Sequence, residues 1–331
     1  MLCTATSLAS HHAPANNRYR STAGKSPSSS TQRRLKRLGA ALRQSLIFQD
    51  DALQPLLPPA TAIAGCGGGS NGAPTLKQRI AAGEMIVGIN VPLRPHTTKE
   101  QIEAAIEAHD VSVDFLFLDG QHSPLNEETV ARLCGYAHDL SLPMHFRIKH
   151  TQHTYLVGNM LDLGPALIEV PQVETIETAQ DAVENFYFRN WTGGRGRRSF
   201  GGNKLAWNPE QLAGRLDYTD WWNKHGMLCI QLESINAYTN ADKLAVPGVD
   251  LLTWGPADTC FDLEAHPEHP FKTPDDCLIH AMAVVKAAGL KTKFSVRTGD
   301  TAALGHGLTG AAARQHYLDL GVTVFMETGG Y

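Results

Sequence analysis

Short apolar runs alternate with helical stretches along most of this chain, and this alternation constrains the fold more than any other feature of the sequence. Eight runs have the length and composition of buried strands: 84–92, 113–119, 143–149, 166–173, 226–234, 249–256, 290–296 and 322–328. The segments between them with helical spacing include 98–109, 127–140, 175–187, 274–288 and 309–320. Apolar strands that alternate with helices indicate a parallel sheet covered on both faces. Eight such units within about 250 residues predict an α/β fold of the (β/α)8 TIM-barrel type.

An open, doubly wound parallel sheet is the alternative that the same alternation allows. It is disfavoured because no GxGxxG fingerprint follows the first strand. Two features depart from a regular repeat. Residues 189–225 form a long predicted loop with several tryptophans, and loops of this length are often functional. The chain also stops at Tyr331, shortly after the eighth strand, so we expect the final helix to be missing or supplied from elsewhere.

The composition excludes several classes of function. A 42% hydrophobic chain of 331 residues can form a large core, and its net charge of −4 gives no general attraction to nucleic acid or anionic lipid. No stretch reaches the roughly 18 consecutive apolar residues that a membrane-spanning helix needs. The six cysteines form no CxxC pair. They indicate reduced thiols and therefore a cytoplasmic protein.

The first 73 residues are predicted to be a disordered basic leader and Gly-rich linker, and residues 74–331 are predicted to be the barrel domain. Residues 1–49 contain no Asp or Glu but eight Lys or Arg. This composition resembles an organelle transit peptide, which would place the protein in an organelle matrix. An unstructured tail, or a start codon placed too far upstream, is the alternative. The linker is the flexible stretch GCGGGSNG.

Polar side chains follow several predicted strands at the point where each strand ends. The six are Asp119, His122, Arg147, Gln231, Glu233 and Asp258. The reacting groups of a barrel enzyme come from the carboxyl ends of several strands, which meet at one rim. We therefore expect these six side chains to converge on one site.

Glu233 and Asp258 are candidate metal ligands. They follow neighbouring strands, which run about 4.8 Å apart, so both carboxylates can reach one cation. Two carboxylates without a cysteine favour a hard divalent ion such as Mg²⁺ or Mn²⁺, with positions left for water and substrate. The alternative is that each acid caps the helix that follows its strand.

Asp119, His122 and Arg147 are candidate catalytic residues. His122 could be a base whose ring an acid orients, although an Asp-Gly-x-His turn also occurs for local reasons. Arg147 lies between Phe146 and Ile148 in an apolar strand, and a buried guanidinium needs an anion. Either a structural ion pair with Asp119 or a substrate oxyanion would provide that anion.

Three other features are weaker candidates. Segment 145–153, HFRIKHTQH, holds three histidines that suggest zinc, but no cysteine accompanies them. Segment 194–200, GRGRRSF, is a basic cluster that is either a solvated loop or a loop for anion binding or subunit contact. Lys149 is the one strand-borne candidate for a Schiff base.

Six segments together resemble one family. FLFLDGQHSP, HFRIKH, ALIEVPQVET, GRGRRSF, CIQLES and WGPAD occur here in the order found in the pyruvate aldolases of the HpcH/HpaI type. That family is typified by 4-hydroxy-2-oxoheptanedioate aldolase and 2-keto-3-deoxy-sugar-acid aldolases. The GRRSF string is also similar to macrophomate synthase, which decarboxylates oxaloacetate. The resemblance covers about residues 74–331.

The resemblance implies a barrel of the phosphoenolpyruvate/pyruvate-binding type, a divalent metal (Mg²⁺, Mn²⁺ or Co²⁺) and cleavage of a 4-hydroxy-2-oxo acid to pyruvate and an aldehyde. It implies that Glu233 and Asp258 bind the metal with Gln231 beside it. His122, paired with Asp119 and acting through a bound water, would be the base. Arg147 would stabilise an enolate, and the backbone amides of Ala257 and Asp258 would bind the pyruvate carboxylate.

Three departures from the family limit what the resemblance implies. Gln121 stands where the family usually has Glu, the final helix that relatives exchange between subunits of a homo-oligomer is absent, and the tryptophan-bearing loop does not identify the aldehyde. Three alternative functions remain: a CoA-ester lyase similar to citrate lyase β, with phosphates held by residues 195–198, an oxaloacetate decarboxylase, and an impaired barrel kept for binding or assembly.

Overall fold

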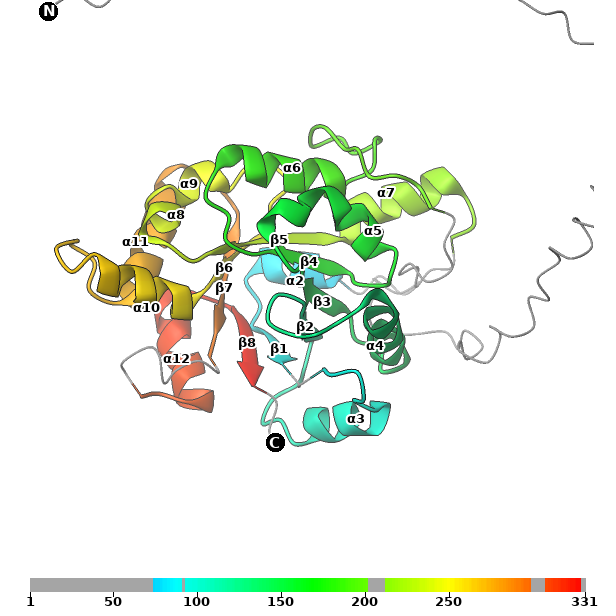
Figure 1. Ribbon diagram of the computed structural model, residues 1–331, viewed down its shortest axis with the longest axis horizontal. Coiled ribbons are helices and arrows are strands. Elements are labelled where there is room, and N and C mark those ends of the chain that lie inside the picture. Colours follow the sequence, from blue (N-terminus) through cyan, green and yellow to red (C-terminus); the bar gives the residue numbers. More distant parts are fainter. Residues whose placement is uncertain (1–73, 91–92, 202–211, 299–306, 329–331) are drawn as a thin grey trace, which may run out of the picture. The chain divides into compact units, whose positions relative to one another are not determined.

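Eight parallel strands close into a barrel in the computed structural model, which describes residues 74–90, 93–201, 212–298 and 307–328 (Figure 1). The strands follow chain order around the barrel, and β1 pairs with both β2 and β8. Their bounds are β1 Ile86–Asn90, β2 Phe115–Asp119, β3 Met144–Arg147, β4 Leu167–Val170, β5 Met227–Leu232, β6 Leu251–Trp254, β7 Lys293–Arg297 and β8 Val324–Thr328. The predicted TIM barrel is confirmed, and the open sheet is excluded.

Helices surround the strands in the view of Figure 1. The five predicted helices are present, and the structure adds others. The bounds are α2 Leu76–Ala82, α3 Lys99–Glu107, α4 Glu127–Asp139, the 3₁₀ helix η3 Thr151–Leu156, α5 Val157–Leu161, α6 Ile176–Phe186, α7 Arg215–His225, α8 Ile235–Thr239, α9 Ala241–Leu244, α10 Pro256–Ala265, α11 Pro274–Ala287 and α12 Gly310–Leu320.

The ends of the helices are set by local sequence. Thr98 and Thr273 begin α3 and α11 with capping boxes, in which each threonine oxygen accepts from a backbone N–H three residues on. Gly321 ends α12 with a φ of 98°, a left-handed conformation that glycine adopts without steric cost. The threonines therefore set where α3 and α11 begin, and Gly321 ends α12 where the chain turns into β8.

The predicted loop 189–225 is partly wrong, because its second half contains α7. Trp221 and Trp222 on this helix are buried in the core, and the Trp222 ring lies 5.6 Å from Phe186. Trp191 stacks on Tyr187 with ring centroids 4.0 Å apart. Trp191, Trp221 and Trp222 of the predicted loop therefore pack against the core, because burial of large apolar area stabilises the fold, and Trp207 lies outside the described residues.

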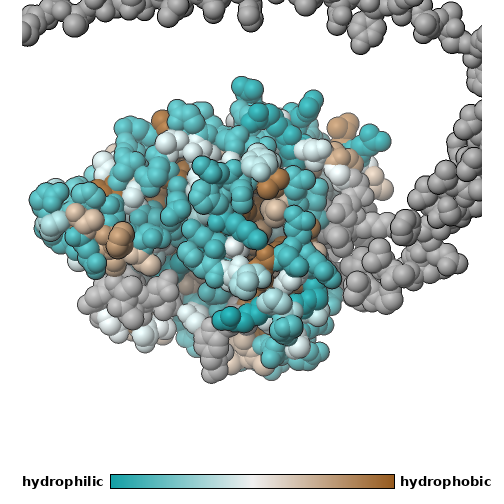
Figure 2. All heavy atoms as spheres, in the orientation of Figure 1, coloured by the Kyte–Doolittle hydropathy of each residue, from teal (hydrophilic) through white to brown (hydrophobic). Residues whose placement is uncertain are grey.

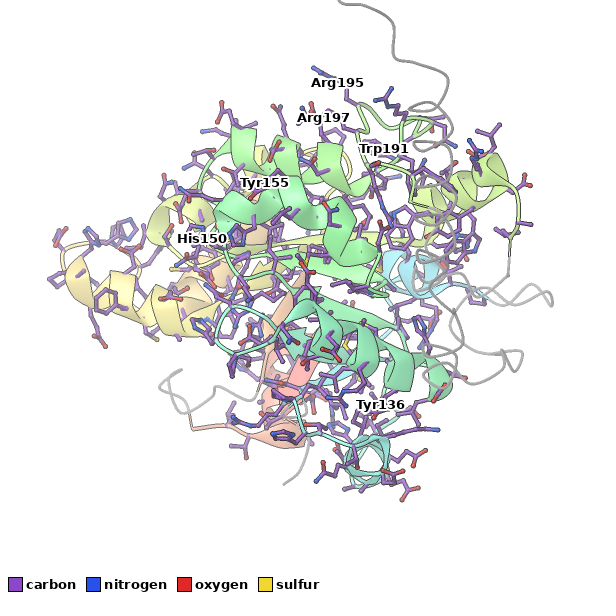
Figure 3. The ribbon with its side chains drawn as sticks, turned by 45° about the vertical axis from the view of Figure 1, so that its right-hand side comes forward. Tyr136, His150, Tyr155, Trp191, Arg195 and Arg197 are labelled. Atoms are coloured by element: carbon purple, nitrogen blue, oxygen red, sulfur yellow. The ribbon has the colours of Figure 1, made fainter. Side chains whose placement is uncertain are left out.

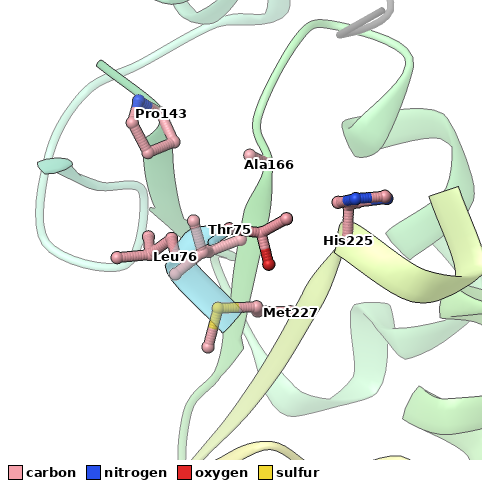
Figure 4. A pocket seen from close by; sticks show the side chains of 7 residues that line it. Thr75, Leu76, Pro143, Ala166, His225 and Met227 are labelled. Atoms are coloured by element: carbon pink, nitrogen blue, oxygen red, sulfur yellow. The ribbon is translucent and has the colours of Figure 1, made fainter. Parts of the chain in front are cut away.

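The surface shown in Figure 2 is mainly hydrophilic, with small separate apolar areas. Within the described ranges, no helix combines the length and apolarity that crossing a membrane requires. A small pocket lies where β3, β4 and β5 begin, at the amino-terminal end of the barrel (Figure 4). It is lined by Thr75, Leu76, Pro143, Ala166, Leu167, His225 and Met227. The predicted polar residues lie at the opposite, carboxyl-terminal end.

Candidate active site

Arg147 is the central side chain at the carboxyl-terminal end of the barrel. It is the last residue of β3, and its register partner on β2 is Asp119. The guanidinium donates two hydrogen bonds to the Asp119 carboxylate, at 2.9 Å from Nε and 2.7 Å from Nη2. Nη1 donates to Oε1 of Gln231 at 3.1 Å. This bidentate pairing fixes the plane of the guanidinium as well as its charge.

Asp119 is held as an anion. Burial opposes its ionisation, but the hydrogen bonds and charge of Arg147 outweigh burial and hold the pKa of Asp119 below its usual value. Its Oδ1 also accepts from the backbone N–H groups of Gln121 at 2.9 Å and His122 at 3.4 Å. The ion pair between Arg147 and Asp119, which was one of the two anion partners expected for Arg147, is therefore present.

His122 lies in the exposed turn after β2. Its hydrogen bond to Asp119 in the described part of the chain comes from the backbone N–H of His122. Gly120 allows this turn to pass close to β3, since a Cβ there would lie 2.6 Å from the carbonyl oxygen of Arg147. Orientation of the His122 ring by Asp119 stays a prediction.

Glu233 is a buried carboxylate that is only partly paired. It directly follows β5, and its Oε1 lies 3.9 Å from Nη1 of Arg147. Its Oε2 has no hydrogen-bond partner among the described residues. Burial, followed by the charge of Asp258, raises the pKa of Glu233 to about 8. A carboxylate in such a place ionises at neutral pH when a cation joins it.

The chain around Glu233 is closely packed at Gly255. A Cβ added at Gly255 would lie 2.5 Å from Cγ of Glu233 and 2.7 Å from Nε2 of Gln231. Only glycine fits at this distance, because real Cβ atoms do not approach other heavy atoms so closely. The β6–α10 connection therefore packs directly against the acid that follows β5.

Asp258 lies in the first turn of α10, where it is exposed. The residue that caps this helix is Gly255, and no side-chain cap is present among the described residues. Ser234, not Glu233, caps α8. Neither acid has the capping role that was the alternative to metal binding. Pro256 at the first helical position has no N–H, so Ala257 and Asp258 supply the first free amides of α10.

Two charged residues inside the barrel were missed by the sequence analysis. Glu169 on β4 is fully buried and pairs with Arg297 at the end of β7, across the barrel interior. Nε2 of His145 lies 3.4 Å from Oε2 of Glu169. Burial lowers the pKa of His145 to about 4, so the ring is neutral. The sequence did contain a signal for Glu169 and Arg297, because each is a charged residue within an apolar strand, as Arg147 is.

The three histidines of segment 145–153 do not converge. His145 is inside the barrel, in contact with the rings of Phe115 and Phe117. His150 precedes η3 and His153 lies on it, with ring centroids 6.2 Å apart. The suggested zinc site is therefore not formed. Lys149 is exposed and lies beyond the end of β3.

The basic cluster of segment 194–200 lies against α6 and is labelled in part in Figure 3. Arg197 pairs with Asp181 and Glu184, and Nε of Arg195 lies 3.6 Å from Glu184. Arg198 is buried between the rings of Phe188 and Trp222, and pairs with Asp162 at 2.8 Å. These guanidinium groups are engaged within the chain.

A separate group of possible metal ligands lies near the end of β8, where atoms of His109, Asp110 and Glu327 are within 4.8 Å of one another. Arg314 already occupies this group. It donates to both oxygens of Glu327 at 2.9 Å and to Asp110 at 2.6 Å. A guanidinium at the centre of the carboxylates makes this an ion-pair network rather than a metal centre.

Relatives with known names match most of the barrel. A hydroxypyruvate/pyruvate aldolase of Roseobacter denitrificans is 30% identical over 191 residues, which cover 56% of this chain and 67% of that protein. A 4-hydroxy-2-oxo-heptane-1,7-dioate aldolase of Salmonella arizonae is 28% identical over 218 residues, covering 64% and 76%. Both relatives carry an aldolase name, in agreement with the resemblance seen in the sequence.

Solved structures share the fold. An HpcH/HpaI aldolase of Desulfitobacterium hafniense aligns with a TM-score of 0.62 at 21% identity, covering 78% of this chain and 91% of that one. Macrophomate synthase aligns with a TM-score of 0.56 at 18% identity, covering 76% and 83%. The model of the HpcH/HpaI aldolase/citrate lyase family matches residues 98–323. This protein therefore belongs to the HpcH/HpaI aldolase/citrate lyase family and is an enzyme of the aldolase type.

Proposed function

We propose that the protein is a metal-dependent carbon–carbon lyase that reversibly cleaves a 4-hydroxy-2-oxo acid to pyruvate and an aldehyde. The observation that carries this proposal is the fixed guanidinium of Arg147 beside the partly paired, buried carboxylate of Glu233. One group supplies a rigid positive charge, and the other offers an oxygen for a cation. The names of the two aldolase relatives support the same reaction class.

The residues at this end of the barrel fit a divalent cation. Oε2 of Glu233 is buried without a hydrogen bond in the described structure, and the charge of Asp258 reaches the same carboxylate. Two carboxylates without thiols suit a hard ion such as Mg²⁺, Mn²⁺ or Co²⁺. We propose that Glu233 and Asp258 hold this ion. When bound, the ion supplies a Lewis acid that stabilises negative charge on the 2-oxo oxygen.

Arg147 stabilises the enolate that carbon–carbon cleavage produces. Its guanidinium is already oriented by Asp119 and Gln231, so no reorganisation is needed when charge develops on the substrate. Loss of one such preorganised donor typically reduces kcat by about 10² to 10³, or about 2.7 to 4 kcal/mol. This is the largest single contribution that we assign to a side chain of the site.

His122 acts as the general base. Its exposed position after β2 leaves the ring free to reach a substrate at the mouth of the barrel. It removes the proton of the 4-hydroxyl group in cleavage and a methyl proton of pyruvate in synthesis, directly or through water. The amides of Ala257 and Asp258 at the start of α10 bind the substrate carboxylate, because a helix amino terminus favours an anion.

A CoA ester is a poorer fit to the structure. The arginines that would hold its phosphates are paired with Asp181 and Glu184 on α6, or buried with Asp162. Binding a phosphate there would require breaking these ion pairs. Comparing turnover of free 2-oxo acids with that of CoA thioesters distinguishes the two substrate classes.

Metal removal tests the proposed function. We expect purified protein treated with a chelator to lose release of pyruvate from a 4-hydroxy-2-oxo acid, and to regain it with Mg²⁺, Mn²⁺ or Co²⁺. A matched sample dialysed without chelator controls for loss of folded protein. Full activity after the metal has been removed, verified by elemental analysis, would contradict the proposal. A panel of aldehydes offered with pyruvate, with products read by mass, then identifies the second substrate.

A further inference from the structure

A buried ion pair crosses the barrel beneath the candidate site. Arg297 at the end of β7 donates from Nη2 to Oε1 of Glu169 on β4, although β5 and β6 lie between these strands in the sheet. Glu169 is fully buried, and Arg297 is 8% exposed. Barrel interiors are usually filled by layers of apolar side chains, and a buried ion pair commonly stabilises a fold less than such packing does. The pair therefore calls for a reason beyond stability.

The position of Glu169 makes it a competitor for Arg147. Along the sheet, Arg147 has Asp119 as its register partner on β2 and Glu169 as its register partner on β4. Directly registered residues of parallel strands point to the same side of the sheet. Arg147 thus has a carboxylate on each side, and it bonds only to Asp119 among these two. The carboxylate with which Arg147 pairs matters, because pairing with Asp119 also directs Nη1 of Arg147 toward Gln231.

Arg297 accounts for this choice. Its guanidinium engages Glu169 and lies 4.5 Å from the ring centroid of Phe117, while the guanidinium of Arg147 lies 6.0 Å from the same ring. The guanidinium groups of Arg147 and Arg297 therefore both lie near the ring of Phe117, and each is paired with a different carboxylate. His145 also faces Glu169, but it is neutral and brings no competing charge. Without Arg297, Glu169 would be a buried anion whose neighbour in register is Arg147.

We propose that Arg297 is a positioning residue for the active site: by engaging Glu169, it keeps Arg147 paired with Asp119 and directed toward Gln231 and the substrate. The kinetic part of this inference rests on the proposed aldol reaction. The structural part, the choice of carboxylate by Arg147, does not. An unpaired buried carboxylate is strongly disfavoured, so Glu169 would draw the guanidinium of Arg147, its neighbour in register, once Arg297 is removed.

Substitution of Arg297 and substitution of Glu169 should change kcat to different extents. Arg297→Gln leaves Glu169 free to draw Arg147 away, and we expect kcat to fall about 10²-fold, as for loss of a fixed donor. Glu169→Gln removes the competitor and leaves Arg147 on Asp119, so we expect kcat to stay within about threefold of the unchanged protein. The double variant Glu169→Gln/Arg297→Gln should regain most of the kcat lost in Arg297→Gln. KM for the 2-oxo acid should change little.

The difference in kcat between the two single variants distinguishes a positioning role of Arg297 from a purely structural one. A merely structural ion pair would be equally damaged from either side, and thermal unfolding of the full chain records that loss for both single variants. Equal loss of kcat in Glu169→Gln and Arg297→Gln, or unchanged kcat in Arg297→Gln, overturns the proposal. Arg297→Lys keeps a cation beside Glu169 and should retain most of kcat. A loss in Arg297→Lys as large as in Arg297→Gln overturns it as well, and this variant serves if Arg297→Gln does not fold.

A crystal structure of Arg297→Gln, or of Arg297→Met if needed for crystals, gives a readout independent of activity. We expect the guanidinium of Arg147 to bond Glu169 in place of Asp119. Arg147 still paired with Asp119 overturns the inference. If the unchanged protein shows no aldolase activity, the proposed function fails, and this structural comparison still decides whether Arg297 positions Arg147.

Discussion

Both ends of the barrel carry charged side chains that are at least partly buried, but the partners of these charges differ. At the amino-terminal end, Asp250 bonds to Lys77 at 2.9 Å and accepts from the backbone N–H of Leu228. Asp114 in the same way bonds to Arg79 at 2.7 Å and accepts from Val87. At the carboxyl-terminal end, Oε2 of Glu233 has no partner in the described ranges.

This difference in pairing distinguishes charged groups that stabilise the fold from charged groups that are available for binding or catalysis. The paired and hydrogen-bonded carboxylates of Asp114 and Asp250 at the amino-terminal end fix α2 and the strand starts in place. The carboxyl-terminal end instead retains one acid with a raised pKa beside a rigid guanidinium. Such unbalanced groups are typical of functional sites. Four experiments test whether the two ends differ in this way.

The largest effect is expected for Arg147→Met. Because we propose this guanidinium as the preorganised donor to the enolate, kcat should fall about 10² to 10³-fold. Steady-state kinetics of pyruvate release measure the change, and circular dichroism verifies that the variant is folded. The matched control at the other end of the barrel is Lys77→Met, which should leave kcat unchanged. A loss below tenfold in Arg147→Met would remove Arg147 from the reaction.

Asp250→Asn should affect stability alone. It removes the partner of Lys77 in a partly buried pair and weakens the support of α2, so we expect the free energy of unfolding to fall by about 2 to 3 kcal/mol. Chemical denaturation measures this change, and kcat per folded molecule should be the same as for the unchanged protein. A change in kcat at constant stability would show that the amino-terminal end takes part in catalysis.

Glu233→Gln should have opposite effects on the metal-free and metal-loaded protein. Above about pH 4.5 the unfolded chain ionises Glu233 while the folded protein resists ionisation until about pH 8, so folding is penalised across this window. The substitution removes the penalty and should stabilise metal-free protein by about 1 to 2 kcal/mol at pH 7. Thermal unfolding with and without Mn²⁺ measures both states. A variant that still gains stability from Mn²⁺ would exclude Glu233 as a ligand.

The last prediction concerns His145. Its folded pKa, lowered by burial to about 4, means that the unfolded chain binds a proton first as pH falls. Stability should therefore be complete above about pH 6.5 and decrease toward pH 4, with a slope from this group of at most about 1.4 kcal/mol per pH unit. His145→Leu should remove that part of the slope. Denaturation between pH 7 and pH 4.5 compares the two proteins, and identical slopes would contradict a buried neutral His145.

Much of the site could be predicted from sequence because the strand ends are local features. Arg147 stands out as a charge in an apolar strand, and the acids after the fifth and sixth strands follow from the carboxyl-end rule of barrels. Glu169 and Arg297 carry the same signal but are 128 residues apart. Nothing local indicates that they meet, since their contact crosses the interior of a closed barrel.

The eight strands, the barrel and the residues at its carboxyl-terminal rim could all be predicted from local patterns, because periodicity and strand ends depend on residues close together in the chain. Which charge pairs with which became apparent only in the folded structure. Asp119 bonds Arg147 rather than the His122 ring, and Arg297 engages Glu169. The physical reason is that ion pairing depends on distance and burial, and both are set only when the barrel closes.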